Sequence, residues 1–129
     1  MKIKRNKMFS GTPWEPMMGY ARAVQVGDTV YVSGTTGTDP SGKVLAPGDA
    51  YAQTVQSIRN IENALKRLGL GLEHVVRTRV YLTQMDRWEE VAKAHVEIFG
   101  QIHPATSLIG VSRLVDPEML VEIEAVAVS

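Results

Sequence analysis

Residues 119–128, near the end of the chain, have the alternating pattern of a β-strand with two different faces. Met119, Val121, Ile123, Ala125 and Ala127 fall on one face of an extended strand, and Leu120, Glu122, Glu124, Val126 and Val128 fall on the other. The first face is wholly apolar, whereas the second carries two carboxylates. An unpaired carboxylate is costly to bury, so Glu122 and Glu124 must reach water, a cation or a ligand. The sequence therefore predicts a closing strand with a core on one side and acidic groups on the other.

The rest of the chain alternates between strand and helix patterns. Further strands are predicted at 20–26, 29–33, 74–83 and 105–112, with a short alternating piece at 1–4. Two amphipathic helices follow Asp49 and Asp86, which are placed as N-caps, and they end at Gly69 and Gly100. The proline- and glycine-rich residues 10–19 are predicted to form a loop that packs Trp14, Met17 and Met18 against the fold.

This order of elements predicts one α+β domain over residues 1–129, with a mixed six-stranded sheet and two helices on one face. In strand 74–83, the residues expected to face the helices are Val76, Thr78, Val80 and Leu82. Their neighbours Arg77, Arg79 and Tyr81 share the uncovered face with the two glutamates. A mixed apolar and charged face of this kind favours association between copies of the chain.

Composition and charge exclude several classes of function. The 129 residues contain 14 basic and 14 acidic side chains, so no basic excess drives binding to nucleic acid or to a membrane surface. The absence of cysteine excludes disulfides, thiolate catalysis and cysteine-ligated metals. No stretch has the length of a signal peptide core or a membrane span, which favours a cytoplasmic location.

The three histidines do not form a recognisable site. His74, His95 and His103 lie on different predicted elements without the spacing of metal ligands, and no metal site is predicted. His95 is expected to pack on the apolar stripe of the second helix, whereas His103, before a proline, is a candidate for a loop near a site. The Gly-x-Ser-x-Gly motif of serine hydrolases is missing.

A more promising set of polar groups lies at strand ends, where ligand-binding groups usually gather. Tyr20 offers a phenol, Ser33 and Thr106 offer hydroxyls, and Gly34 opens an irregular loop whose backbone N–H groups can reach a ligand. Glu122 is the candidate general base that holds or activates a water. The alternative is that Glu122 pairs with an arginine such as Arg79 and only supports the sheet.

Six short motifs follow one another at family-specific spacing from about residue 19 to the end. They are Gly-Tyr-Ala-Arg-Ala-Val at 19–24, Val-Tyr-Val-Ser-Gly at 30–34, Ala-Gln-Thr at 52–54, Val-Arg-Thr-Arg-Val-Tyr-Leu-Thr-Gln-Met-Asp at 76–86, His-Pro-Ala-Thr at 103–106 and Val-Glu-Ile-Glu-Ala at 121–125. Each motif alone is weak, but the ordered set resembles the YjgF-type Rid family of reactive enamine and imine deaminases, also labelled L-PSP endoribonucleases.

The resemblance implies a chorismate-mutase-like fold, a homotrimer with a small-molecule cleft between subunits, and no cofactor. It assigns catalysis to Glu122 and substrate binding to Tyr20, Ser33 and position 106. Gly34 is added to the predicted substrate-binding residues because of its place in the irregular loop. In the family's deaminases an arginine at that position grips the substrate carboxylate, and here it is Thr106. A threonine lacks both the charge and the planar fork of a guanidinium.

A second departure is Ala92, which aligns with an asparagine common in the family. Arg22 and His103 are the candidates to replace the lost cation. The sequence therefore predicts hydrolysis of an enamine or imine other than the usual 2-imino acids. The alternative is a non-catalytic trimeric protein that binds a small molecule or another partner. A ribonuclease function ranks third, because the chain is neutral and lacks an acid–base pair of histidines.

Overall fold

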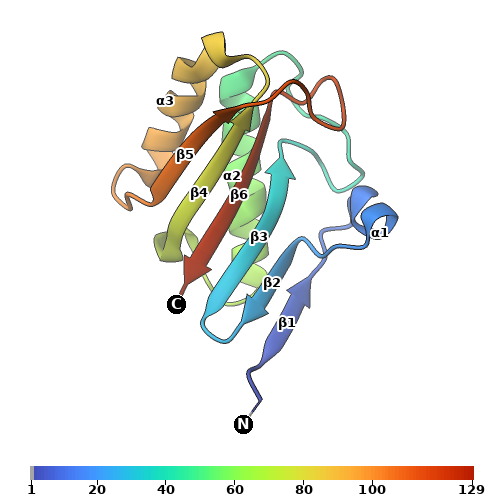
Figure 1. The fold of residues 1–129 in the computed structure, drawn as a ribbon, viewed down its shortest axis with the longest axis vertical. Helices are drawn as coiled ribbons and strands as arrows, with labels where there is room; N and C mark the ends of the chain where they lie inside the picture. The colour runs from blue at the N-terminus through green and yellow to red at the C-terminus, as the bar shows by residue number, and fades with distance from the viewer. Residues whose placement is uncertain (1) are drawn as a thin grey trace.

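The computed structural model describes residues 2–129, which form a six-stranded sheet with two long helices on one face (Figure 1). The strand order is β1-β2-β3-β6-β4-β5, and all neighbours are antiparallel except the parallel pair β4 and β5. The strands are β1 (Arg5–Met8), β2 (Ala23–Val26), β3 (Thr29–Thr36), β4 (Val75–Leu82), β5 (Ala105–Gly110) and β6 (Val121–Val128).

The closing strand β6 lies in the middle of the sheet, between β3 and β4. Its apolar face is buried as predicted, because Val121, Ile123, Ala125 and Ala127 are each at most 2% exposed and pack in the main core. On the other face, Glu122 lies between Thr36 of β3 and Tyr81 of β4. The alternation in the sequence therefore fixes which face of the sheet carries the acidic groups.

Helix α2 (Ala50–Arg67) begins and ends as the sequence predicts. Asp49 caps its N-terminus by accepting a hydrogen bond from the backbone N–H of Ala52 at 2.9 Å. After the helix, Gly69 adopts a φ of 83°, which a residue with a side chain rarely takes. Within residues 2–129, no helix combines the length and apolar character needed to cross a membrane.

Helix α3 (Trp88–Phe99) starts differently from the prediction. Asp86 does not cap it, because residues Met85–Arg87 form a 3₁₀ turn, η2, that leads directly into the helix. Arg87 and Glu90 join across the first turn by a bidentate ion pair of 3.0 Å. Gly100 follows the helix at its C-terminal end, as predicted.

The predicted inward set of β4 is wrong at one residue. A bulge between Val75 and Arg77 shifts the register against β6, so Val75 is buried and Val76 is 48% exposed. From Thr78 onward the alternation holds, with Thr78, Val80 and Leu82 buried beneath the helices.

The predicted loop 10–19 contains a short helix, α1 (Trp14–Met18). Met17 and Met18 are each 78% exposed, so the prediction that they pack against the fold is wrong. The buried residues of this segment are instead Thr12 and Glu15, at 7% and 3% exposure. The first strand is Arg5–Met8 rather than residues 1–4, of which residue 1 lies outside the described part of the chain.

Candidate functional site

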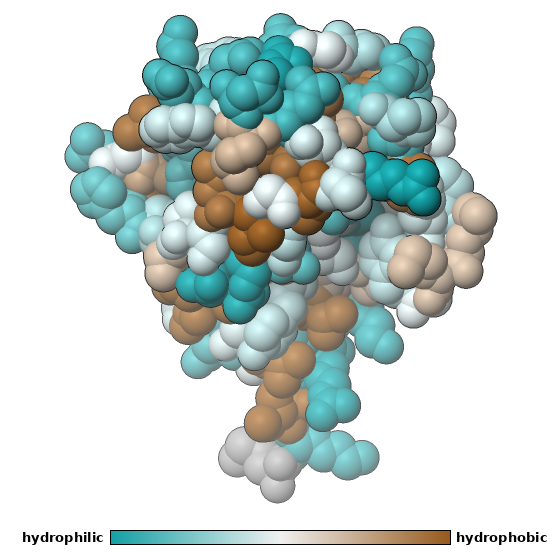
Figure 2. All heavy atoms as spheres, turned by 45° about the horizontal axis from the view of Figure 1, so that its top comes forward, coloured by the Kyte–Doolittle hydropathy of each residue, from teal (hydrophilic) through white to brown (hydrophobic). Residues whose placement is uncertain are grey.

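Glu122 lines a small pocket of about 100 Å³ where β3 ends and β6 begins. Tyr20, Arg22, Gly34 and Thr36 line one part of this pocket, and the remaining lining residues are Trp14, Met18, Val115 and Met119. Figure 2 views this end of the molecule, where apolar side chains gather in the middle and polar side chains surround them. The pocket thus combines one carboxylate with mainly neutral and apolar groups.

The carboxylate of Glu122 makes no hydrogen bond or ion pair with any residue between 2 and 129. The nearby Arg79 lies 3.8 Å from Glu124 instead, and the Tyr81 hydroxyl also donates to Glu124 at 3.0 Å. Within this chain the alternative that Glu122 pairs with Arg79 is therefore wrong. Burial, reinforced by the Glu124 carboxylate, raises the pKa of Glu122, and Arg22 opposes this shift.

At Gly34 the backbone of β3 lies in close contact with the Glu122 carboxylate. The register between β3 and β6 shifts between Val32 and Thr35, and Gly34 lies within this irregularity. A Cβ atom on Gly34 would lie only 2.7 Å from the carboxyl carbon of Glu122. Because a Cβ contact below 3 Å forces a neighbour to move, only glycine leaves Glu122 in its observed position.

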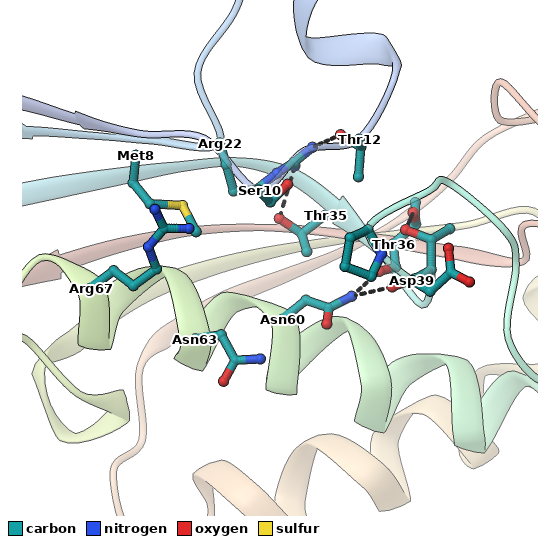
Figure 3. Close-up of a pocket in the computed structure, with 12 residues that line it drawn as sticks. Met8, Ser10, Thr12, Arg22, Thr35, Thr36, Asp39, Asn60, Asn63 and Arg67 are labelled. Carbon is teal, nitrogen blue, oxygen red and sulfur yellow. Dashed lines mark hydrogen bonds between the residues drawn. The ribbon is translucent and has the colours of Figure 1, made fainter.

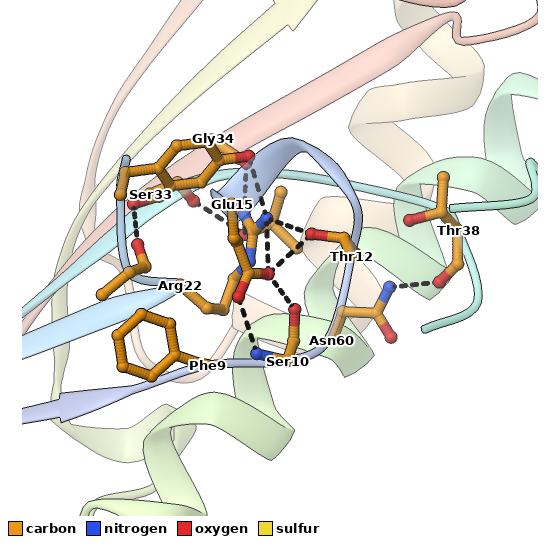
Figure 4. Close-up of polar contacts among 12 residues, drawn as sticks. Phe9, Ser10, Thr12, Glu15, Arg22, Ser33, Gly34, Thr38 and Asn60 are labelled. Atoms are coloured by element: carbon orange, nitrogen blue, oxygen red, sulfur yellow. Dashed lines mark hydrogen bonds and ion pairs between the residues drawn. The ribbon is translucent and has the colours of Figure 1, made fainter. Parts of the chain in front are cut away.

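Arg22 is the centre of a buried polar cluster beside the pocket (Figure 4). Its Nη2 atom lies 3.3 Å from the Glu15 carboxylate, and the two side chains are 6% and 3% exposed. Nη1 donates to the Gly34 carbonyl oxygen and to the hydroxyl of Thr35. Glu15 also accepts from the backbone and hydroxyl of Ser10, so the cluster ties α1 to the end of β3.

The same cluster orients the phenol of Tyr20. Arg22 Nη2 donates to the Tyr20 oxygen at 3.3 Å, and the guanidinium lies 5.4 Å from the centre of the ring. Because the phenol oxygen accepts this hydrogen bond, its own hydrogen remains available to donate into the pocket. Both terminal nitrogens of Arg22 are engaged with protein groups, and its charge is paired with Glu15, so it does not act as a free cation for a substrate carboxylate.

The structure brings Tyr20, Gly34 and Glu122 together, but it places the other two predicted residues elsewhere. Ser33 donates to the Ala21 carbonyl oxygen at 2.7 Å and lines a neighbouring open groove that shares Tyr20 with the Glu122 pocket. Thr106 lies on edge strand β5, on the helix-covered face of the sheet, where it contacts Thr78 at 2.7 Å. Thr106 and Glu122 therefore do not meet within one chain.

A second pocket, of about 180 Å³, lies on the helix-covered side of β3 (Figure 3). It is lined by polar groups from the N-terminal segment, β3 and α2, including Arg22, Asn63 and Arg67. Asn60 donates to the carbonyl oxygens of Thr36 and Thr38 at 2.9 Å, which ties α2 to the segment after β3. Within residues 2–129, no group of three or more metal-ligating side chains is present.

Glu15, the partner of Arg22, was not among the residues predicted from the sequence. A signal for it exists, because Thr12-Pro-Trp-Glu15 has the spacing of a capping box with a proline at the start of the helix. The structure has the side chains of that pattern in contact, with Thr12 Oγ1 donating to Glu15 at 2.6 Å. The proline and glycine content of the segment instead led to the prediction of a loop.

The family model described as Endoribonuclease L-PSP matches residues 11–129. The chain belongs to this family, the YjgF-type Rid family. A solved Mycobacterium tuberculosis member of the YjgF/YER057c/UK114 family is 44% identical, with a TM-score of 0.88, and the match covers 98% of this chain and 100% of that one.

The names of two further relatives state an enzyme activity in one case and a bound ligand in the other. A mouse protein named 2-iminobutanoate/2-iminopropanoate deaminase is 36% identical over 95% of this chain and 90% of its own length. The E. coli protein TdcF, solved with bound serine, is 25% identical with a TM-score of 0.78, and 85% of this chain and 87% of that one are covered. The predicted α+β fold of the Rid family is therefore confirmed.

Proposed function

We propose that this protein hydrolyses the C=N bond of a small imine, or of the enamine in equilibrium with it, in a cleft between subunits of a homotrimer. The observation that carries the proposal is the half-buried, unpaired carboxylate of Glu122 with its raised pKa. A basic carboxylate in a confined pocket is suited to accept a proton from water. The name of the mouse relative supports the same class of reaction.

In the proposed reaction, Glu122 accepts a proton from a water molecule whose oxygen adds to the imine carbon. Glu122 passes this proton to the imine nitrogen, which gives a tetrahedral intermediate with one hydroxyl and one amino group. The hydroxyl proton then moves through Glu122 to the amino nitrogen as the C–N bond breaks, which restores the Glu122 carboxylate. Ammonia leaves and a carbonyl product remains. The Tyr20 hydroxyl, whose oxygen is held by Arg22, is positioned to donate a hydrogen bond to the reacting substrate. Backbone groups at Ser33 and Gly34 line the approach from β3.

A second copy of the chain is needed to complete this cleft. Glu122 lies on the uncovered face of the sheet, whereas Thr106 lies on the opposite face near the β5 edge. A small molecule that touches both residues must therefore take them from different subunits. Edge strand β5 also exposes Leu108 at 39% and Ile109 at 37%, which favours a protein partner at that edge. Sedimentation at micromolar concentration should give the mass of a trimer.

The proposed substrate differs from the 2-imino acids at the end that faces position 106. Thr106 supplies a hydroxyl where the family's deaminases have an arginine, and a hydroxyl cannot neutralise a carboxylate. Arg22 does not compensate, because Glu15 and four neutral acceptors engage it. We therefore propose an imine without a carboxylate at this end.

The test is release of ammonia from 2-iminopropanoate and from imines that lack a carboxylate, each generated in the assay by an amine oxidase. The wild-type protein should act faster on the carboxylate-free imines. Glu122→Gln should reduce that rate at least about 100-fold, as is typical for loss of a general base. Glu118→Gln is the matched control, because Glu118 is an exposed carboxylate in the loop just before β6. Equal rates for Glu122→Gln and the wild type would refute the catalytic role.

The Thr106→Arg variant tests the substrate assignment. It should gain activity on 2-iminopropanoate, because the added guanidinium can bind the carboxylate with two hydrogen bonds. If the wild type binds imines but releases no ammonia from any of them, the protein is a small-molecule binder and the hydrolase proposal fails.

A further inference from the structure

An open pocket of about 340 Å³ lies between helix α3 and edge strand β5, on the Thr106 side of the sheet. Figure 1 shows where these two elements lie in the fold. The walls of the pocket are mainly apolar, and they include Trp88, Val91, Val96, Phe99 and Leu108. The polar side chains that line it are His95, His103 and Thr106. None of the side chains that line this pocket is a carboxylate, an ammonium or a guanidinium. The pocket falls within the volume range of small-molecule sites.

A chain of hydrogen bonds connects Thr106, Thr78 and His95 and indicates which ring nitrogen of His95 carries the hydrogen. Thr106 Oγ1 donates to the Pro104 carbonyl oxygen at 3.2 Å and lies 2.7 Å from Thr78 Oγ1. We assign the single hydrogen of Thr106 to Pro104, so that Thr78 donates to Thr106. Thr78 then has no hydrogen left for His95 Nε2, which lies 3.0 Å away. Nε2 must therefore carry the hydrogen and donate to Thr78.

The other ring nitrogen of His95 is consequently a free acceptor. Burial lowers the pKa of His95, which favours the neutral ring, and a neutral ring protonated at Nε2 has a lone pair on Nδ1. Nδ1 makes no hydrogen bond with residues 2–129. Among residues 2–129, Arg77 Nε is the one side-chain nitrogen or oxygen atom that is fully buried and has no hydrogen-bond partner. Because Nδ1 of His95 also has no partner, it must retain some exposed surface, and we take this surface to face the pocket that His95 lines.

We infer that this pocket binds an uncharged aromatic ring that carries one N–H or O–H donor, with the ring against the apolar walls and the donor on His95 Nδ1. The inference rests on the proposed function in one respect, since it takes the Thr106 side of the cleft as a surface that contacts ligand. The inference narrows the proposed substrates to imines with an aromatic group at the end that faces Thr106. A carboxylate is disfavoured, because no lining side chain is an arginine or a lysine and burial favours the neutral form of His95, which leaves His103 as the one lining group that can carry a positive charge.

Ala92 also lines the pocket, and its small side chain leaves room for a ring. A leucine at this position would fill the space while keeping a good helix-forming residue. Lys93 provides the matched control, because it is the next residue of α3 and is exposed rather than part of the lining. The pair Ala92→Leu and Lys93→Leu therefore separates filling of the pocket from the general effect of an added leucine.

The experiment measures binding of three probes by isothermal titration calorimetry on the full chain. The probes are indole, benzofuran, which has the same shape but no N–H, and indole-3-carboxylate, which adds a charge. Benzofuran should bind roughly three- to tenfold more weakly than indole, which corresponds to loss of one hydrogen bond. Indole-3-carboxylate should bind at least about tenfold more weakly, because its anion loses water and meets no arginine or lysine in the lining of the pocket. Ala92→Leu should weaken indole binding about tenfold or more, and Lys93→Leu should not change it.

Nitrogen NMR of the imidazole provides a second readout that does not depend on affinity. In the free protein His95 should carry its hydrogen on Nε2, and indole should shift the Nδ1 signal. Equal affinity of the three probes, equal affinity of wild type and Ala92→Leu, or a hydrogen on Nδ1 would overturn the inference. Absence of indole binding at millimolar concentration, as expected if another copy of the chain fills the groove, would overturn it as well.

Indole binding tests the aromatic site and ammonia release tests the proposed hydrolysis, so either proposal can be refuted without the other. Indole binding with the predicted selectivity, but no ammonia release from any imine, refutes the hydrolase proposal and leaves the aromatic site in place. Ammonia release without indole binding refutes the aromatic site alone. The Glu122→Gln variant should lose turnover, whereas the matched control Glu118→Gln, at an exposed carboxylate outside this pocket, should change neither turnover nor the affinity for indole.

Discussion

Removing the guanidinium of Arg22 should destabilise the protein strongly. The Glu15–Arg22 pair is 3.3 Å long, and the two side chains are 3% and 6% exposed. Arg22→Met fills similar space but leaves the Glu15 carboxylate buried without its cation. Breaking a buried pair from one side typically costs about 3–5 kcal/mol. For a chain of this length, we expect Tm to fall by roughly 10–20 °C.

A double-mutant cycle measured by urea unfolding, at one protein concentration, gives the coupling energy of the pair. Glu15→Gln combined with Arg22→Met removes both charges, so the double variant should be about 1–3 kcal/mol more stable than the sum of the single effects implies. Arg59→Met is the matched control, because Arg59 pairs with Glu62 at the exposed surface and should change stability by less than about 1 kcal/mol. A loss below about 1 kcal/mol for Arg22→Met, or strict additivity, would refute the reasoning.

The same pair has a pH signature. Burial acts to raise the pKa of Glu15, but hydrogen bonds from Ser10 and Thr12, together with the charge of Arg22, outweigh it. The net result is that the pKa of Glu15 is lowered. An acid with a lowered pKa in the folded state stabilises the fold above its ordinary pKa, and this contribution is lost as the pH falls through the lowered value. The difference in stability between wild type and Glu15→Gln should therefore shrink as the solution is acidified.

Three further outcomes follow from the same structure. Gly34→Ala should cost only about 1 kcal/mol, because the flexible end of Glu122 can move away from the new Cβ, but ammonia release should fall at least about tenfold. Glu122→Gln should raise Tm at neutral pH, since a raised pKa means that the ionised form destabilises the fold, and the gain should vanish below the ordinary pKa of glutamate. Gln53→Leu should cost about 3 kcal/mol in urea unfolding, because it removes bonds to the backbone of Glu118 and Leu120 and leaves those groups without partners. Unchanged values in any of these measurements would contradict the contact on which that prediction depends.

Periodicity predicted the framework of the fold because burial of one face dictates it. The β6 alternation and the α2 stripe, including Ile58, Ile61 and Leu65, lie where the sequence placed them. The Asp49 cap was also predictable, because it depends on residues close in the chain. The exposure of Val76 was not predictable, since the bulge beside it depends on how β4 registers against β6, a strand distant in the sequence.

The candidate site was predictable in part. Family spacing placed Tyr20, Gly34 and Glu122 at one site, and the structure has them in one pocket. The role of Glu15 was missed, because only the return of α1 onto β3 gives this carboxylate a buried cation. Position 106 could be assigned from the motif, but its location on the opposite face from Glu122 depends on how β5 registers against β4, where Thr106 pairs with the buried Thr78.

The central place of β6 has a consequence for synthesis. It is the last of the six strands to leave the ribosome, yet it joins β3 to β4 and thereby connects the two halves of the sheet. Until residues 121–128 emerge, the nascent chain carries two incomplete half-sheets with unpaired strand edges, which are prone to aggregation. Folding must therefore wait for the end of translation of this domain, and nascent chains that stop before β6 should depend on chaperones to stay soluble.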